Sequence, residues 1–166
     1  WEVDPAMATV ALSNMARERR PWAALQLLRC MRERQLQVSA FHCRSAMSAC
    51  EKAGQWELAF GLLCDMTQSR IALDVIACNI AISSCRRSGR WRLALAVLGS
   101  MPELLLRPDA ISCSAAVSSC KKRGRWEQSL RVLGLLPDFH IAPDIVSCSA
   151  AMSACQGSSQ WQLPLA

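Results

Sequence analysis

The chain of 166 residues contains ten cysteines, enough for several disulfides or a metal site, and their spacing decides which chemistry is open to them. Eight of them form two series with a period of 35 residues: Cys43, Cys78, Cys113 and Cys148, then Cys50, Cys85, Cys120 and Cys155. Partners seven residues apart lie on one helix face, about 10 Å apart along the axis. That is too far for a disulfide, which needs Cα atoms about 4.4–6.8 Å apart.

The same spacing disfavours a metal site. Zinc ligands usually stand two to four residues apart, and only His42 and His140 could add imidazole ligands. We therefore predict no disulfides, no metal and no cofactor, and interpret the cysteines as small buried apolar residues in a reducing compartment.

The cysteines belong to a repeat that divides the chain without gaps into units 5–39, 40–74, 75–109, 110–144 and a truncated 145–166. The place of a residue is its position within its unit. The seventh place is always Ala and the ninth is always Ser. Regular periods of this length indicate stacked repeats, so we interpret residues 1–166 as one repeat array.

Each unit has the pattern of a helical hairpin. Apolar residues at places 4, 7, 8 and 11 share one helix face. Glycine follows at 54, 89 and 124, and a second periodic stretch such as 91–101 comes next. Pro108 or Pro143 is expected to stop the second helix, and the Asp after it to cap the next unit. Stacked hairpins bury a shared core, which predicts an all-α solenoid with nine or ten helices.

Tryptophans begin the second helices, and we predict them to be core residues: Trp22, Trp56, Trp91, Trp126 and Trp161. Pro164 replaces a small residue in the last unit and is expected to break its second helix.

Composition narrows the function classes. The net charge of +6 and pI of about 9.0 favour an anionic partner, nucleic acid first. No uninterrupted apolar run reaches the ~18 residues of a membrane span, so we expect a soluble protein. The chain begins at Trp1 rather than Met, so we expect any targeting segment to have been lost or left out. There is no Ser, His and acid set and no Gly-rich phosphate loop, so we predict no enzyme.

Residues 74–109, DVIACNIAISSCRRSGRWRLALAVLGSMPELLLRPD, resemble the pentatricopeptide repeat along their whole length. The shared features are Asp before two apolar residues, Asn at place 5, Gly near place 15, Ala-Leu near place 20, Met at place 27 and a closing Pro-Asp. The resemblance covers residues 4 to 161. It implies a right-handed superhelix of about five hairpins that binds single-stranded RNA in chloroplasts or mitochondria.

The resemblance also implies roles for particular places. The fifth and last residues read a base, so Asn79 with Asp109 is similar to a uracil reader and Ser114 with Asp144 to a guanine reader. Arg44 with Asp74, and Thr9 with Ser39, match no standard combination, and Ser149 has no partner in the chain. The second place packs on base faces: Phe41, Ile76, Ile111 and Val146, with Ala6 too small to contribute. The thirteenth place meets phosphate: Arg17, Lys52, Arg87 and Lys122, with Gly157 in the last unit.

Two function hypotheses remain open. One is an RNA-binding module for organellar RNA processing, stability or translation. Two readers, each contributing about 1–3 kcal/mol of discrimination, are too few to select one site in a genome, so such a module would belong to a longer array or bind loosely. The alternative is a scaffold whose concave surface holds protein subunits of an organellar complex.

Overall fold

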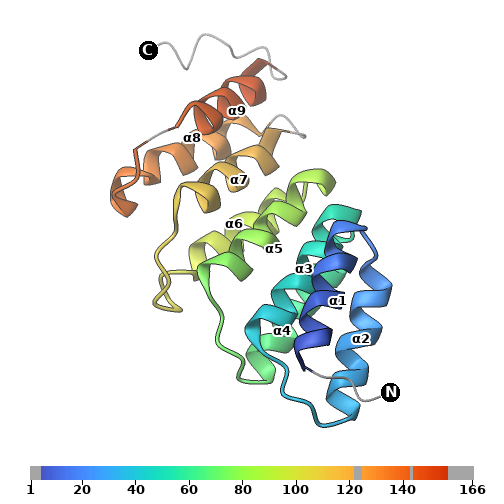
Figure 1. Ribbon diagram of the computed structural model, residues 1–166. Coiled ribbons are helices and arrows are strands. Elements are labelled where there is room, and N and C mark those ends of the chain that lie inside the picture. The colour runs from blue at the N-terminus through green and yellow to red at the C-terminus, as the bar shows by residue number, and fades with distance from the viewer. Residues whose placement is uncertain (1–4, 122–124, 143, 157–166) are drawn as a thin grey trace. The chain divides into compact units, whose positions relative to one another are not determined.

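A computed structural model describes residues 5–121, 125–142 and 144–156. This part of the chain is helical, with nine α-helices, one short 3-10 helix and no strands: α1 (Pro5–Arg17), α2 (Pro21–Glu33), α3 (Ala40–Ala53), α4 (Trp56–Gln68), α5 (Val75–Ser88), α6 (Trp91–Ser100), α7 (Ala110–Lys121), α8 (Trp126–Leu135), η1 (Pro137–Phe139) and α9 (Ile145–Gln156). Two helices arise from each complete unit, as the hairpin pattern predicts (Figure 1).

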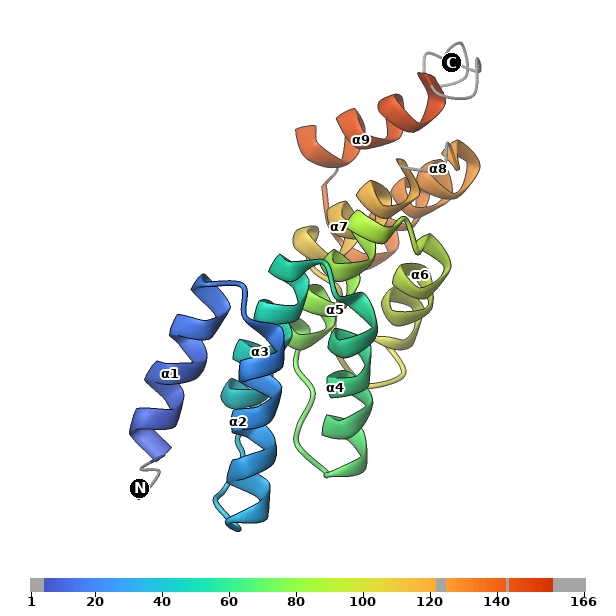
Figure 2. The same cartoon turned by 90° about the vertical axis from the view of Figure 1, so that its right-hand side faces the viewer.

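The chain forms two compact bodies, Trp1–Ser84 and Cys85–Ala166, and the division falls within α5. In the first body α3 packs against α1, α2 and α4, an arrangement that can be followed in Figure 2. In the second body α7 packs against α6, α8 and α9. The fold is an all-α helical-repeat solenoid, in which first helices of neighbouring units pack on one another, as α1 on α3 and α7 on α9.

Small side chains let these first helices approach closely. Cys43, Ala46 and Cys50 of α3 are fully buried, and Cys113, Ala116 and Cys120 of α7 repeat them in the second body. Larger residues complete the first core, where Leu12, Met31, Met47 and Met66 have no or almost no exposed surface. The prediction that Cys78 and Cys85 are buried on one face of α5 is confirmed. The predicted burial of the two cysteine series is confirmed for seven of the eight residues, whereas Cys148 is half-buried.

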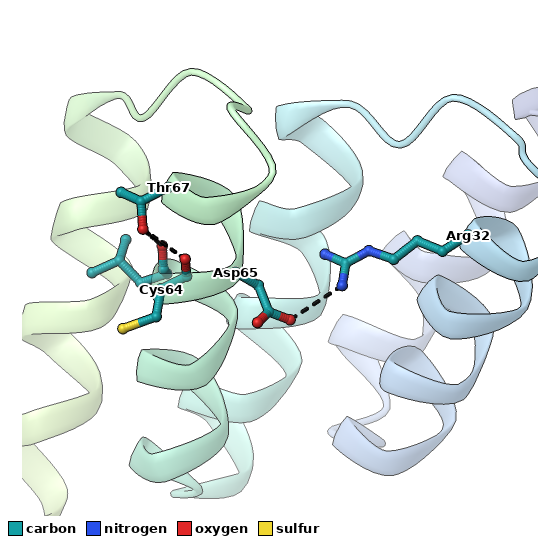
Figure 3. Close-up of polar contacts among 5 residues, drawn as sticks. Arg32, Cys64, Asp65 and Thr67 are labelled. Carbon is teal, nitrogen blue, oxygen red and sulfur yellow. Dashed lines mark hydrogen bonds and ion pairs between the residues drawn. The ribbon is translucent and has the colours of Figure 1, made fainter.

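An ion pair links two second helices of the first body. Arg32 Nη1 of α2 lies 3.2 Å from Asp65 Oδ2 of α4, and Figure 3 shows the arginine reaching across to the neighbouring hairpin. On α4 the Thr67 hydroxyl turns back to donate to the Cys64 carbonyl at 2.6 Å. Both side chains of the pair are partly exposed, so the pair contributes little to the stability of the fold.

The helix ends correct one expectation. The first helices α3 and α5 end at Gly54 and Gly89 with φ of 78° and 65°, as predicted, while Gly124 lies outside the described residues. Pro108 does not end the second helix of its unit, because α6 already stops at Ser100. Pro143 lies outside the described residues. The second helices end at Glu33, Gln68, Ser100 and Leu135. The chain then reverses at place 31, where non-glycine residues adopt φ of 53–61°: Gln35, Arg70, Leu105 and His140.

Each of these left-handed residues belongs to a Schellman motif. The N–H of the following apolar residue donates to a carbonyl five residues back, as in Leu36 to Met31 at 2.9 Å and Ile71 to Met66 at 2.9 Å. The bond recurs at Leu106 and Ile141. These motifs reverse the chain before the proline is reached, which explains why the proline is not the helix terminator.

The tryptophans were predicted to be core residues, and this prediction is wrong. Trp22 is 63 % exposed, and Trp56, Trp91 and Trp126 are half-buried. Trp161 and Pro164 lie outside the described residues. Each of the four described tryptophans begins its helix or stands one residue after its start, where part of the side chain reaches the surface. In the described part of the chain no helix has the length and apolar content needed to cross a membrane.

Candidate nucleic-acid interface

The apolar residues at place 2 lie exposed on the first turns of the first helices. Phe41 is 43 % and Ile76 55 % exposed, in the first body, and Ile111 is 61 % and Val146 57 % exposed, in the second. Large apolar side chains at the surface cost free energy unless something packs on them. Ala6 occupies the same place in the first unit, and its side chain is not among those that the structure describes.

The basic residues at place 13 lie at the opposite ends of the same helices. Arg17 ends α1, Lys52 is in the last turn of α3 and Arg87 in the last turn of α5, and all three are exposed. Lys122 and Gly157 lie outside the described residues. Of the first helices, α3, α5, α7 and α9 thus carry an exposed apolar residue at place 2, and α1, α3 and α5 carry an exposed cation at place 13.

A groove on the second body brings the two kinds of residue together. It has a volume of about 430 Å³ and is lined by residues of the first helices: Arg86, Ser118, Lys121, Val146, Ser149, Ala150 and Ser153. We call it the α7–α9 groove. Among the described residues, two cations, three serine side chains and one exposed apolar side chain line it, and no carboxylate does. This set is suited to a phosphodiester whose base lies on an apolar surface.

The cations of this groove were missed by sequence reasoning. Arg86 and Lys121 occupy place 12, one residue before the residues expected to meet phosphate. A signal was present, because place 12 is basic in both of these units. One residue turns a side chain by about 100° around a helix, so the choice between neighbouring cations depends on helix phase.

The aspartates at the last place cap the following helix. Asp74 Oδ1 accepts from the Ala77 N–H at 2.8 Å, and Asp109 Oδ1 from the Ser112 N–H at 2.8 Å. The capping predicted from the sequence is confirmed at these positions. In the first unit Ser39 takes the place of Asp and forms a capping box with His42, which accepts from the Ser39 N–H at 3.1 Å through Nδ1.

Asp144 caps α9 in the same way. It accepts from the Ser147 N–H at 2.7 Å and also from the Ser147 hydroxyl. The hydroxyl first, and then the N–H, lower the pKa of Asp144 below its ordinary value, because both bonds favour the carboxylate. At neutral pH Asp144 is therefore ionised and offers a ligand acceptors only.

Arg44 and Asp74 are brought together in an ion pair. Arg44 Nη1 binds Asp74 Oδ2, while Asp74 Oδ1 holds its cap. The Arg44 guanidinium also lies over the Phe41 ring, 5.9 Å from its centroid. Three residues expected to contact one base therefore contact one another, which reduces what this unit offers to a base.

Thr9, the fifth residue of the first unit, is also engaged by the protein. Its hydroxyl lies 2.9 Å from Nε2 of His42, which is buried. Because His42 Nδ1 accepts from Ser39, Nε2 carries the proton and donates to Thr9. The imidazole thereby links α1 to α3.

The remaining fifth-place residues differ in accessibility. Asn79 is buried at 8 % exposure and lies in the first body, whereas Asp109 lies in the second. Ser114 donates to the Ile111 carbonyl at 3.2 Å and Ser149 to the Val146 carbonyl at 3.0 Å, both within their own helices. Ser149 is exposed and lines the α7–α9 groove.

Comparisons with known proteins agree with this architecture. The family model for the PPR repeat, the pentatricopeptide repeat, matches residues 41–71 and 76–104. A search of curated protein sequences gave no significant match. Residues 41–71 and 76–104 are therefore pentatricopeptide repeats, as the sequence predicted.

Solved structures extend the likeness of fold to nearly the whole chain. The pentatricopeptide repeat protein PPR10 from maize is 22 % identical with a TM-score of 0.75, over 96 % of this chain and 23 % of that one. PPR10 bound to an 18-nucleotide psaJ RNA element is 20 % identical with a TM-score of 0.80, over 97 % and 24 %. The PPR domain of Arabidopsis thaliana protein-only RNase P 1, bound to tRNA, is 13 % identical with a TM-score of 0.81, over 96 % and 86 %. The chain thus spans about a quarter of PPR10 and most of the RNase P repeat domain.

Proposed function

We propose that the chain is a single-stranded RNA-binding module and that the α7–α9 groove holds one nucleotide of the strand. The observation that carries this proposal is the composition of the groove. Arg86 and Lys121 supply charge for a phosphate, the serines supply hydrogen bonds, and Val146 supplies a surface on which a base can lie.

The wider interface follows from the repeat. Exposed apolar residues recur at place 2 of units two to five, and a cation recurs at place 13 of units one to four, joined by one at place 12 in units three and four, as a strand contacting successive units would require. We propose that residues 1–166 act as one array, and that Ser114 with Asp144, and Asn79 with Asp109, select bases. Each capping carboxylate would use its second oxygen for a base. Arg44 with Asp74 would read weakly, since each already neutralises the other.

Two structural neighbours bound to RNA support this proposal. The PPR10 complex contains an RNA element and the RNase P 1 domain contains tRNA, and both share this fold. The second of these matches is to a repeat domain, so we assign the chain a binding role and no catalysis. On the basis of the family resemblance we propose that the module acts in an organelle and contributes there to RNA processing, stability or translation.

The experiment is RNA binding measured against salt for wild type and the double variant Arg86→Gln/Lys121→Gln. Each phosphate contact on a single strand contributes about 0.7 to the log–log salt slope, so the double variant should lose about 1.4. The matched control Arg107→Gln/Arg131→Gln removes the same charge from the same body, away from the groove, and should keep the slope.

A wild-type protein that binds no RNA at low salt would refute the proposal, and so would equal slopes for the groove variant and wild type. In the first case a protein partner would be the better hypothesis, to be sought by cross-linking at Ile111 and Val146. Base selection is tested separately by Asn79→Ser, which should leave the slope unchanged and shift preference from uracil towards guanine.

A further inference from the structure

A second cluster of cations lies at the start of α6, outside the α7–α9 groove. Arg90, Trp91 and Arg92 begin the helix, and Arg125 approaches from the turn before α8. The Arg92 guanidinium carbon lies 5.2 Å from the centroid of the Trp91 ring, and that of Arg125 lies 5.7 Å from it. We call these four residues the Trp91 cluster.

The cluster surrounds a cavity open to solvent. The cavity has a volume of about 410 Å³ and is lined by Gly89, Leu93 and the four cluster residues, with no carboxylate among the residues that the structure describes. The three arginines are exposed, and Trp91 is half-buried. A guanidinium over an indole ring is held by a cation–π contact and can still donate hydrogen bonds to a ligand.

Helix electrostatics make this arrangement unfavourable for the protein alone. Arg90 is the N-cap of α6 and Arg125 the N-cap of α8, and neither side chain caps its helix. The N-terminus of a helix carries a partial positive charge, so cations there are repelled, typically by 0.3–1 kcal/mol each. An anion bound at this point would be attracted by the arginines and by both helix ends.

The equivalent turn in the preceding unit shows what the fold itself requires. There the N-cap is Gln55, Trp56 follows, and Glu57 stands in the first turn. In α8 the residue after the tryptophan is likewise acidic, Glu127. Tryptophan with an acidic neighbour is therefore sufficient to build this turn. The arginines around Trp91 are therefore an addition that the start of the helix does not require.

We propose that the Trp91 cluster is a second anion site, which binds the phosphodiester backbone of single-stranded RNA outside the α7–α9 groove. This inference rests on the proposed function. The two sites are close along the chain, since Arg86 of the groove precedes Arg90 by four residues. A strand leaving the groove near Arg86 meets the cluster next. Guanidinium groups bind phosphate oxygens in pairs, which selects a phosphodiester over a compact monovalent anion.

The test compares RNAs of increasing length on three proteins: wild type, the groove variant Arg86→Gln/Lys121→Gln, and the cluster variant Arg90→Gln/Arg92→Gln/Arg125→Gln. For short RNAs that fill only the groove, the cluster variant should bind like wild type. For longer RNAs it should lose about 2 from the salt slope, three contacts at about 0.7 each, and on the order of tenfold or more in affinity near 0.1 M salt.

Two further variants keep the test independent of folding. Arg90→Gln/Arg92→Glu gives α6 the Gln-Trp-Glu start with which α4 already folds, and it should show a loss at least as large as Arg90→Gln/Arg92→Gln. Arg92→Lys keeps the charge without the planar guanidinium and should retain the slope while losing affinity. Circular dichroism confirms helix content for each protein.

The outcomes separate the two proposals. If the groove variant loses slope and the cluster variant matches wild type at every length, the Trp91 cluster does not bind RNA, although the proposed function stands. Equal loss at short and long lengths would also overturn a separate site, because it would indicate a general charge effect. Wild type that binds no RNA of any length overturns both proposals.

Discussion

Removing the cap at Asp109 should cost about 2 kcal/mol of the free energy of unfolding. The Asp109 carboxylate accepts from the Ser112 N–H at 2.8 Å and from the Ser112 hydroxyl at 2.9 Å. Loss of a cap costs about 1 kcal/mol. Ser112 is fully buried, and Asp109→Ala leaves its hydroxyl without this acceptor, which adds about 1 kcal/mol more.

Urea unfolding followed by circular dichroism measures the loss, and amide hydrogen exchange at the start of α7 locates it. Asp109→Ser is the matched control, because serine can still accept the N–H, and it should cost less than half as much. The double variant Asp109→Ala/Ser112→Ala should cost less than the sum of its two single variants, since each already breaks the same bond. A cost below about 0.5 kcal/mol for Asp109→Ala would refute the capping role. The carboxylate would then serve RNA alone.

Three further predictions concern stability. Gly54→Ala should destabilise the protein by about 1 kcal/mol in thermal unfolding, because the φ of 78° is left-handed, while no atom lies close enough to crowd a new Cβ. Gly54→Asn should cost less, because asparagine tolerates this conformation better, and equal costs for the two variants would contradict this reason. Burial raises the pKa of the Cys50 and Cys113 thiols to about 11, against roughly 8.5 when unfolded. The contribution of the neutral thiols to stability is therefore full below pH 8.5 and is lost as pH rises through 11. Cys→Ala variants at these positions should show a smaller loss of stability when unfolding is measured over this alkaline range. His42→Ala should destabilise the first body by about 1–3 kcal/mol in urea, since it breaks the contacts to Thr9 and the α3 cap; no difference from wild type would show that the histidine is dispensable.

Much of the fold could be predicted because the same local sequence patterns recur in every unit. The spacing of Cys78, Ala81 and Cys85 defines a helix face, and Asp109 defines a cap, because each depends on neighbours within one or two turns. The depth of a side chain is set by tertiary packing instead. For this reason Trp22 was placed in the core, although it is largely exposed.

The kinds of residue at the candidate site could be predicted from the sequence, but the contacts that particular residues make could not. Exposure of Ile111 and Val146 agrees with a base-packing role, which stays a prediction. The pairing of Arg44 with Asp74 could not be read from the sequence, because the residues are 30 positions apart and each was assigned to a ligand. Which of two adjacent cations lines the α7–α9 groove likewise depends on helix phase, and in α5 it is Arg86 rather than Arg87.

The left-handed residues at place 31 are positions where a single substitution could raise the stability of the chain. Gln35, Arg70, Leu105 and His140 hold a conformation that costs an L-residue about 1 kcal/mol and glycine almost nothing. All four are exposed, so a single substitution to glycine or asparagine could raise stability without disturbing the core. Such changes lie outside the α7–α9 groove, and they could offset destabilising changes at base-reading places. A lineage of these proteins could therefore acquire new specificities first and restore stability afterwards, one hairpin at a time.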